Sequence, residues 1–221
     1  MNTIHDLGGM DGFTLPERDQ DFPLHEEWER QIWGLALAVW SKPIPGYPGG
    51  LRADIERIPP EIYLNMSYYE KWVWAEEVAV IRGGLATRAE LDDPDGSLSR
   101  PDIGGFTPAT PADVVAFMEA DDSYERPATT EPRFQPGDEV VVMNNHPAGH
   151  TRCPQYTRGH RGIIQAHHGV HGFQDDEPRD AGEQHLYTVT FTAGELWGDR
   201  GNPNDRVNAE LWEYHLESVT G

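Results

Sequence analysis

The chain contains 221 residues, which is enough for one large domain or two small ones. Its 17 lysine and arginine residues against 38 aspartate and glutamate residues give a formal net charge of -21, so a surface that binds nucleic acid phosphates is not expected. No apolar run approaches the roughly 20 residues of a membrane-spanning helix, and the opening MNTIHDLGGMDGF lacks the order of a signal peptide. We therefore expect a cytoplasmic protein without membrane contact. The single cysteine, Cys153, excludes an internal disulfide and any site that needs two thiolates from this chain.

Composition divides the chain into four parts, which together predict an α+β fold. Residues 1–25 are polar and glycine-rich, with scattered apolar side chains that follow neither a helical nor a strand period. They predict an extended arm that lies across its own domain or over a partner, with a disordered terminus as the alternative. Residues 26–125 are expected to form a helical domain, residues 126–133 a linker, and residues 134–221 a small C-terminal barrel.

The helical domain begins with two helices that apolar spacing predicts. Apolar side chains over residues 26–40 form one broad face, which indicates a helix buried on more than one side. Leu51, Ile55 and Ile58 recur at helical spacing and predict a second helix over residues 51–57, before two prolines.

Three further helices are predicted by their N-terminal capping signals. Ser67 and Thr87 are each followed three residues later by glutamate, the pattern of a capping box. The helix after Ser67 should extend over residues 68–82, where two glycines stop it. Thr110, followed directly by Pro111, predicts a last helix that ends near residue 120.

From residue 134 the apolar pattern changes to that of strands. FQPGDEVVVM and RGHRGIIQAH each indicate a turn followed by a short strand, and LYTVTF alternates its two faces. Short strands separated by glycine and proline turns predict a small closed barrel of the SH3-like kind.

Several possible sites have weak support from their residues. Acidic runs such as Asp175-Asp176-Glu177 lie in expected loops without EF-hand spacing, so we interpret them as surface acid. Eight of the ten histidines lie in the C-terminal half, but no HExxH is present, and His167 and His168 would face opposite sides of a strand. Cys153 has His150 nearby and could act as a nucleophile, although a buried structural cysteine is more common.

Two arginines lie in sequence contexts that suit the binding of an anion. Arg52 lies on an apolar helix, and Arg152 lies in the tight segment PAGHTRCP between expected strands. Each guanidinium could offer a planar fork of donors. The alternative for Arg52 is an ordinary salt bridge to Glu56, four residues away on the same helix face.

At this point the residues resemble the beta subunit of nitrile hydratase, and the resemblance covers the whole chain. In the first half it rests on MNTIHDLGGMDGF, HEEWERQIWGL and PPEIYLNMSYYEKW. In the second half it rests on PAGHTRCPQYTRGHRG, HHGVHGF, HLYTVTF with AGELWG, and AELWEYHLE, in the family's order. Each segment alone is weak, but the ordered set is specific.

The resemblance implies an alpha-subunit partner that binds low-spin cobalt(III) or iron(III) in a Cys-x-x-Cys-Ser-Cys claw with two oxidised cysteines. No metal ligand would lie on this chain. Arg52 and Arg152 match the two family arginines that hydrogen-bond the cysteine oxygens, and Tyr68 matches the tyrosine that reaches the active-site cavity. Glu56 and His150 match positions proposed for a proton network.

The resemblance also assigns the substrate pocket and the assembly. Leu51 and Trp72 would lie among the apolar walls that meet a small nitrile, and Trp72 favours cobalt over iron. Lys71 departs from the family, because some cobalt-type members have histidine there, so a proton-relay role at that position is in doubt. Two heterodimers are expected to form an α2β2 heterotetramer.

Two other functions remain open from the sequence. A thiocyanate hydrolase-type subunit would use similar parts, but its beta-like region is split between two chains, whereas this match is uninterrupted. A non-catalytic adaptor with a peptide- or nucleic-acid-binding barrel is the second alternative, and the charge of -21 weakens its nucleic-acid version.

Overall fold

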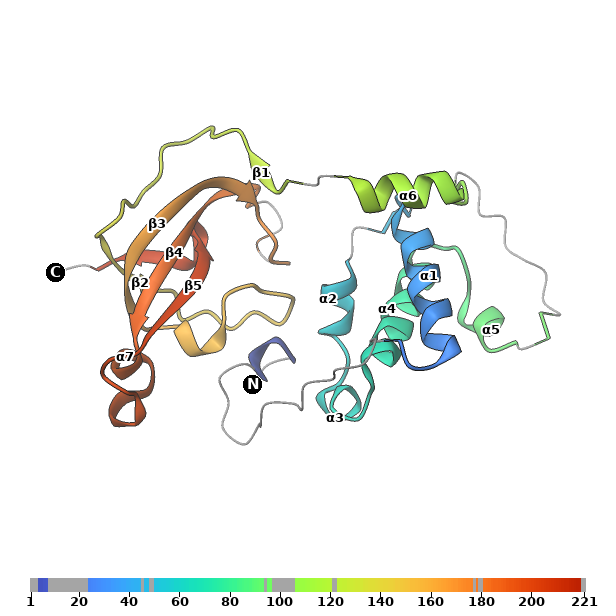
Figure 1. Ribbon diagram of the computed structural model, residues 1–221, viewed down its shortest axis with the longest axis horizontal. Helices are drawn as coiled ribbons and strands as arrows, with labels where there is room; N and C mark the ends of the chain where they lie inside the picture. The colour runs from blue at the N-terminus through green and yellow to red at the C-terminus, as the bar shows by residue number, and fades with distance from the viewer. Residues whose placement is uncertain are drawn as a thin grey trace. The chain divides into compact units, whose positions relative to one another are not determined.

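The computed structural model describes residues 4–7, 24–44, 46–47, 50–93, 95–96, 106–120, 123–176, 178 and 181–219. The chain forms two compact units (Figure 1). One unit combines Met1–Gly12 with Ser123–Gly221, and the other contains Phe13–Asp122. We name them the sheet unit and the helical unit. No helix among the described residues is long and apolar enough to cross a membrane.

The helical unit has six described helices. They are α1 (Glu27–Trp40), α2 (Leu51–Ile55), α3 (Pro60–Tyr63), α4 (Tyr68–Arg82), α5 (Arg88–Leu91) and α6 (Pro111–Glu119). The predicted capping boxes at Ser67 and Thr87 and the predicted helix start at Thr110 are confirmed. In all three, the cap side chain accepts the backbone N–H three residues on, and the cap backbone N–H donates to the carboxylate of that same residue. The second helix ends earlier than the sequence predicts, and α3 follows it from Pro60, a residue type well suited to a first helical turn.

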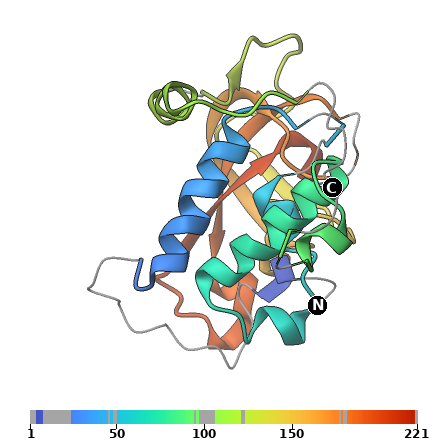
Figure 2. The ribbon, with the colours of Figure 1, turned by 90° about the vertical axis from the view of Figure 1, so that its right-hand side faces the viewer.

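Helix α4 is the centre of the helical unit, because both α1 and α2 pack against it. Ala75 and Ala79 are fully buried on α4, and such small side chains let neighbouring helices approach closely. Helix α6 lies across the C-terminal end of α1 (Figure 2), where Lys42 Nζ lies 2.7 Å from Asp113 Oδ1.

Charged side chains are also buried in this unit. Asp54 on α2 has Arg57 Nη1 at 2.9 Å and Arg82 Nη1 at 3.5 Å, and it accepts a hydrogen bond from the Tyr47 hydroxyl. Three donors for one carboxylate satisfy the requirement that a buried charge be paired.

The sheet unit contains one antiparallel sheet. Its strands are β1 (Glu125–Arg126), β2 (Glu139–Val142), β3 (Arg161–Gly172), β4 (Glu183–Thr192), β5 (Arg206–Trp212) and β6 (Leu216–Ser218). They follow the order β5-β4-β3-β2-β6, with β1 paired to β3. Strand β3 is long and interrupted by two register irregularities, which bend it and let it pair with three other strands.

The core of the sheet unit is made by alternate side chains of these strands, as the pattern of LYTVTF predicts. Tyr187, Val189 and Phe191 of β4 are at most 1% exposed. Gly162 on β3 packs directly against this core, since a Cβ there would lie 2.5 Å from Val189 Cγ1. A larger residue at this position would therefore displace the core.

The described sheet is not closed into a barrel. Its path has β5 at one end and β6 at the other, and no ladder joins those two strands among the described residues. The predicted α+β class agrees with this mixture of helices and sheet, whereas the closed barrel was wrong and the SH3-like assignment stays a prediction.

Of the predicted arm, only the part at Ile4–Leu7 and the last two residues, 24 and 25, lie within the described residues. Ile4–Leu7 forms a short 3-10 helix, η1, that belongs to the sheet unit, so this piece lies on its own chain. Asp6 is fully buried there, with Arg158 Nη2 2.9 Å from its carboxylate.

Candidate functional site

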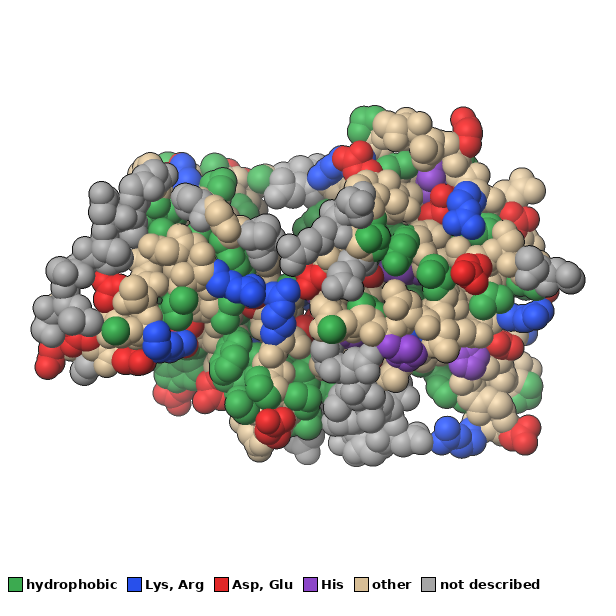
Figure 3. Space-filling model, turned by 180° about the vertical axis from the view of Figure 1, so that it is seen from behind, with side chains coloured by type: hydrophobic (Ala, Val, Ile, Leu, Met, Phe, Trp, Pro, Cys, Tyr) green, Lys and Arg blue, Asp and Glu red, His purple; other side chains and the backbone are tan. Residues whose placement is uncertain are grey.

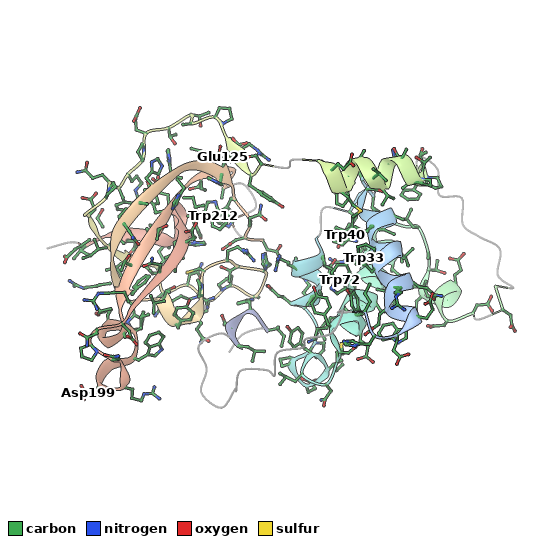
Figure 4. All side chains as sticks on the ribbon, viewed as in Figure 1. Trp33, Trp40, Trp72, Glu125, Asp199 and Trp212 are labelled. Atoms are coloured by element: carbon green, nitrogen blue, oxygen red, sulfur yellow. The ribbon has the colours of Figure 1, made fainter. Side chains whose placement is uncertain are left out.

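The predicted site residues form two sets, one in each unit. Leu51, Arg52 and Glu56 lie on or just after α2, and Tyr68 and Trp72 lie on α4, against which α2 packs. His150 and Arg152 lie in the sheet unit, in the loop between β2 and β3. Figure 4 labels Trp72 together with Trp33 and Trp40 among the side chains of the helical unit.

Arg52 has an exposed side chain, and its guanidinium makes no ion pair with any described residue. The salt bridge to Glu56 that the sequence offers as an alternative is not formed. Glu56 is the C-cap of α2, and its backbone N–H still donates to the Arg52 carbonyl at 2.9 Å, so the helical spacing is kept although the two side chains do not pair. The acid nearest in sequence, Asp54, is already paired with Arg57 and Arg82. Leu51 beside Arg52 is half-buried at the start of the helix.

Tyr68 begins α4 directly after the Ser67 cap, and it is 64% exposed. Its ring lies 5.0 Å from that of Tyr69 and 5.9 Å from that of Trp72, measured between centroids. Tyr69 is buried and fixes this aromatic cluster to the helical unit. Tyr68 therefore has a supported ring, while most of its surface remains accessible.

Lys71 contacts a neighbouring aromatic ring. Its ammonium lies 4.0 Å from the centroid of the Tyr63 ring, a cation–π distance. Burial lowers the pKa of Lys71, although Glu70 nearby acts in the opposite direction.

In the sheet unit, the loop that carries His150 and Arg152 is held by two consecutive acids. Asp175 accepts the backbone N–H of Arg152 at 2.8 Å and the hydroxyl of Thr151 at 2.6 Å. Asp176 accepts the backbone N–H of His150 at 3.1 Å, and its own N–H donates to the His150 carbonyl at 2.9 Å. The backbone of residues 150–152 is thus fixed, while the Arg152 side chain is exposed and has no partner among the described residues.

Asp175 also accepts a hydrogen bond from His215 Nε2 at 2.9 Å, and both side chains are at most 5% exposed. Burial alone would raise the pKa of the Asp175 carboxyl, but the hydrogen bond and charge of His215, helped by Thr151 and the Arg152 N–H, lower it. The interpretation of this acidic run as surface acid was therefore wrong for Asp175. No local signal in the sequence indicates its burial, because its partners Thr151 and His215 lie 24 and 40 residues away.

Cys153, the next residue in the loop, is buried, and its backbone carbonyl is also held by a hydrogen bond. Its carbonyl accepts a hydrogen bond from Arg158 Nη2 at 2.8 Å, and Arg158 is itself paired with Asp6. Burial raises the pKa of the Cys153 thiol to about 11, which suits a packing residue and not a nucleophile.

A small cavity lies beside this loop, with Thr151, Cys153, Asp175 and His215 among its lining residues. Its volume is about 10 Å³, the space of a single water molecule, so it is too small to be a pocket for an organic substrate. Among the described residues, no group of three or more histidine, cysteine, aspartate or glutamate side chains is placed to hold a metal ion.

Comparisons with known proteins give the family. Residues 1–122 match "Nitrile hydratase beta subunit, N-terminal", and residues 123–218 match "Nitrile hydratase beta subunit, C-terminal". The low-molecular weight cobalt-containing nitrile hydratase subunit beta of Rhodococcus rhodochrous is 35% identical over 98% of this chain and 99% of its own length. The cobalt-containing nitrile hydratase subunit beta of Pseudonocardia thermophila is 32% identical over 99% of this chain and 97% of its own.

A solved structure that resembles a smaller part of the chain comes from a different enzyme. It is a recombinant apo-enzyme of thiocyanate hydrolase from Thiobacillus thioparus, 26% identical, covering 40% of this chain and 78% of its own. Its TM-score of 0.37 is too low to carry a structural argument. The two family matches, in contrast, extend over both units, and the chain belongs to the nitrile hydratase beta-subunit family.

Proposed function

We propose that this chain is the beta subunit of a working nitrile hydratase, a hydro-lyase that adds water to a nitrile to give the amide. It acts with an alpha subunit that carries cobalt(III), with iron(III) as the alternative. The names of the two cobalt-containing relatives support cobalt. This chain completes the active site and supplies no metal ligand.

The observation that carries this proposal is the state of the two predicted arginines. In a chain with 38 acidic residues against 17 basic ones, an exposed arginine without a carboxylate partner is a candidate for binding an anion from another chain. Arg52 and Arg152 are both exposed, and neither guanidinium is paired with a described residue. They are therefore free to bind an anion from outside the chain, and the oxygens of oxidised cysteines are such anions.

Exposed apolar side chains on the helical unit support the proposal of a large interface with a partner. Single exposed apolar side chains are ordinary, but monomers rarely expose many of them together. Figure 3 shows hydrophobic side chains gathered over the helical unit, on the left of that view. The large hydrophobic residues exposed on this unit are Trp28, Trp33, Leu35, Ile62, Leu64, Tyr68, Leu91, Val115, Phe117 and Met118. We infer an obligate interface of about 2,000 Å² or more with the alpha subunit, and pairing of two heterodimers into α2β2.

In this mechanism, Arg52 and Arg152 each donate two N–H groups to the cysteine oxygens and hold the geometry of the claw. Tyr68 donates its phenolic hydroxyl to substrate or water, and Leu51 and Trp72 form apolar walls of the substrate pocket. Glu56 and His150 support proton movement behind these groups. The metal, when bound, supplies Lewis-acid chemistry for the addition of water.

The first experiment tests partner, metal and reaction together. The tagged chain is purified from its native host, and native mass, cobalt and iron content, and amide formation from a nitrile are measured. We expect a stoichiometric partner with about one metal ion per pair and amide as the product. A metal-free monomer, or a complex that hydrolyses thiocyanate and leaves nitriles unchanged, would overturn the proposal.

A second experiment tests the arginines in the assembled enzyme. Arg52→Lys and Arg152→Lys should each lower kcat about 10- to 100-fold without loss of assembly, because lysine cannot reproduce the bidentate fork. Arg30→Lys and Arg206→Lys are matched controls, since both arginines are exposed and neither is proposed to contact the cysteine oxygens. Unchanged turnover in both site variants would show that Arg52 and Arg152 do not hold the cysteine oxygens in place.

A further inference from the structure

Asp175 binds three donors from two separate parts of the sheet unit. Its Oδ1 accepts the backbone N–H of Arg152 at 2.8 Å. Its Oδ2 accepts the Thr151 hydroxyl at 2.6 Å and His215 Nε2 at 2.9 Å. One buried carboxylate therefore fixes two consecutive residues of the Arg152 loop against a histidine that follows β5.

His215 is itself held firmly. It lies in the short 3-10 helix Glu213–His215, and its carbonyl accepts the backbone N–H of Met143 at 2.8 Å. Its ring is surrounded by those of Phe173, Tyr214 and Trp212, with centroids 5.8, 5.8 and 6.2 Å away. The strands on either side of it, β5 and β6, belong to the sheet, so this histidine is tied to the rigid part of the unit.

We propose that Asp175 and His215 form a positioning pair that sets the direction of the Arg152 side chain. This inference rests on the proposed function, in which the Arg152 guanidinium binds an anion of the active site. The carboxylate orients the Arg152 backbone and the hydroxyl of the preceding residue, so the Cα–Cβ bond of Arg152 leaves the loop in one direction. The guanidinium then needs little further ordering when it binds its anion, which favours a fixed geometry in the transition state.

If the contact between Asp175 and His215 only stabilises the fold, the effect of removing it would be the same whether residue 152 is arginine or lysine. A positioning pair, in contrast, acts only through Arg152, so its loss should couple to the loss of the guanidinium fork. Double-mutant analysis distinguishes the two possibilities.

The test uses the assembled enzyme and compares Thr151→Val, Asp175→Asn and Arg152→Lys, alone and in pairs. Thr151→Val preserves shape and removes one donor to Asp175, so it provides a readout even where Asp175→Asn does not fold. We expect each single variant to lower kcat about 10-fold or more with a smaller change in KM. Thr151→Ser, which keeps the hydroxyl, should restore kcat. In the Arg152→Lys background, Thr151→Val and Asp175→Asn should have little further effect.

A matched control is Asp138→Asn, because Asp138 likewise accepts a backbone N–H, that of Gln135 at 2.9 Å, in a different turn of the same unit. Its turnover should equal that of the wild type. If Thr151→Val lowers kcat by the same factor in the wild type and in the Arg152→Lys background, that result would overturn the positioning pair and leave the proposed function intact. If Arg152→Lys alone leaves kcat unchanged, the assignment of Arg152 itself fails.

Discussion

At the scale of single residues, Cys153 shows how burial decides chemistry. It follows Arg152 directly, yet its thiol is buried, and burial raises its pKa to about 11 despite the hydrogen bond with Thr157 and the charge of Arg158. At pH 8 only about 0.1% of such a thiol would be the reactive thiolate. We predict that iodoacetamide labels Cys153 far more slowly in the native protein than in urea, as followed by mass spectrometry of its peptide. Equal rates in the two states would contradict the buried position.

At the scale of helices, α1 and α4 are joined by a buried polar contact, in which Trp40 Nε1 donates to Glu76. Burial raises the pKa of Glu76 to about 6 from 4.5, with the charge of Asp54 adding to the effect and the Trp40 hydrogen bond opposing it. The folded state then binds more protons than the unfolded state between these pH values, so stability is lost as pH rises from 4.5 to about 6. Glu76→Gln should therefore raise the free energy of unfolding by up to about 2 kcal/mol at pH 8 and change it little at pH 4. Thermal unfolding at both pH values, with the exposed Glu119→Gln as the control, checks this; a variant that gains nothing at pH 8 would show that the charge of Glu76 is tolerated.

At the scale of the whole molecule, a buried ion pair joins the N-terminal segment to a distant part of the sheet unit. Asp6 and Arg158 lie 2.9 Å apart with side chains at most 1% exposed, and Arg158 also binds the Cys153 carbonyl. Asp6→Asn should lower the free energy of unfolding by about 3 kcal/mol, because the guanidinium stays buried without its counter-charge. Denaturant unfolding of this variant, beside the exposed Asp199→Asn, gives the comparison; equal midpoints for the two variants would mean that the segment around Asp6 contributes no stability.

The sequence by itself determined the features that depend on neighbours in the chain. The helix starts at Ser67, Thr87 and Thr110 were predictable because a capping box or an N-cap followed by proline needs only residues within one helical turn. The core face of β4, formed by Tyr187, Val189 and Phe191, was predictable from the strand period, whereas the burial of Leu186 and Thr188 on the other face was not. The resemblance in the order of short segments indicated the family, which the comparisons then gave.

Only the tertiary structure decided which charged groups meet. The acid run at Asp175 looks like solvated surface, yet its carboxylate is buried by His215 and Thr151 from distant segments. Likewise, Arg52 makes no ion pair with a described residue, although the backbone keeps Glu56 at helical spacing from it. The open sheet also depends on which strand edges meet. Such contacts join residues tens of positions apart, and local spacing carries no information about them, since the folding of the whole unit brings their partners together.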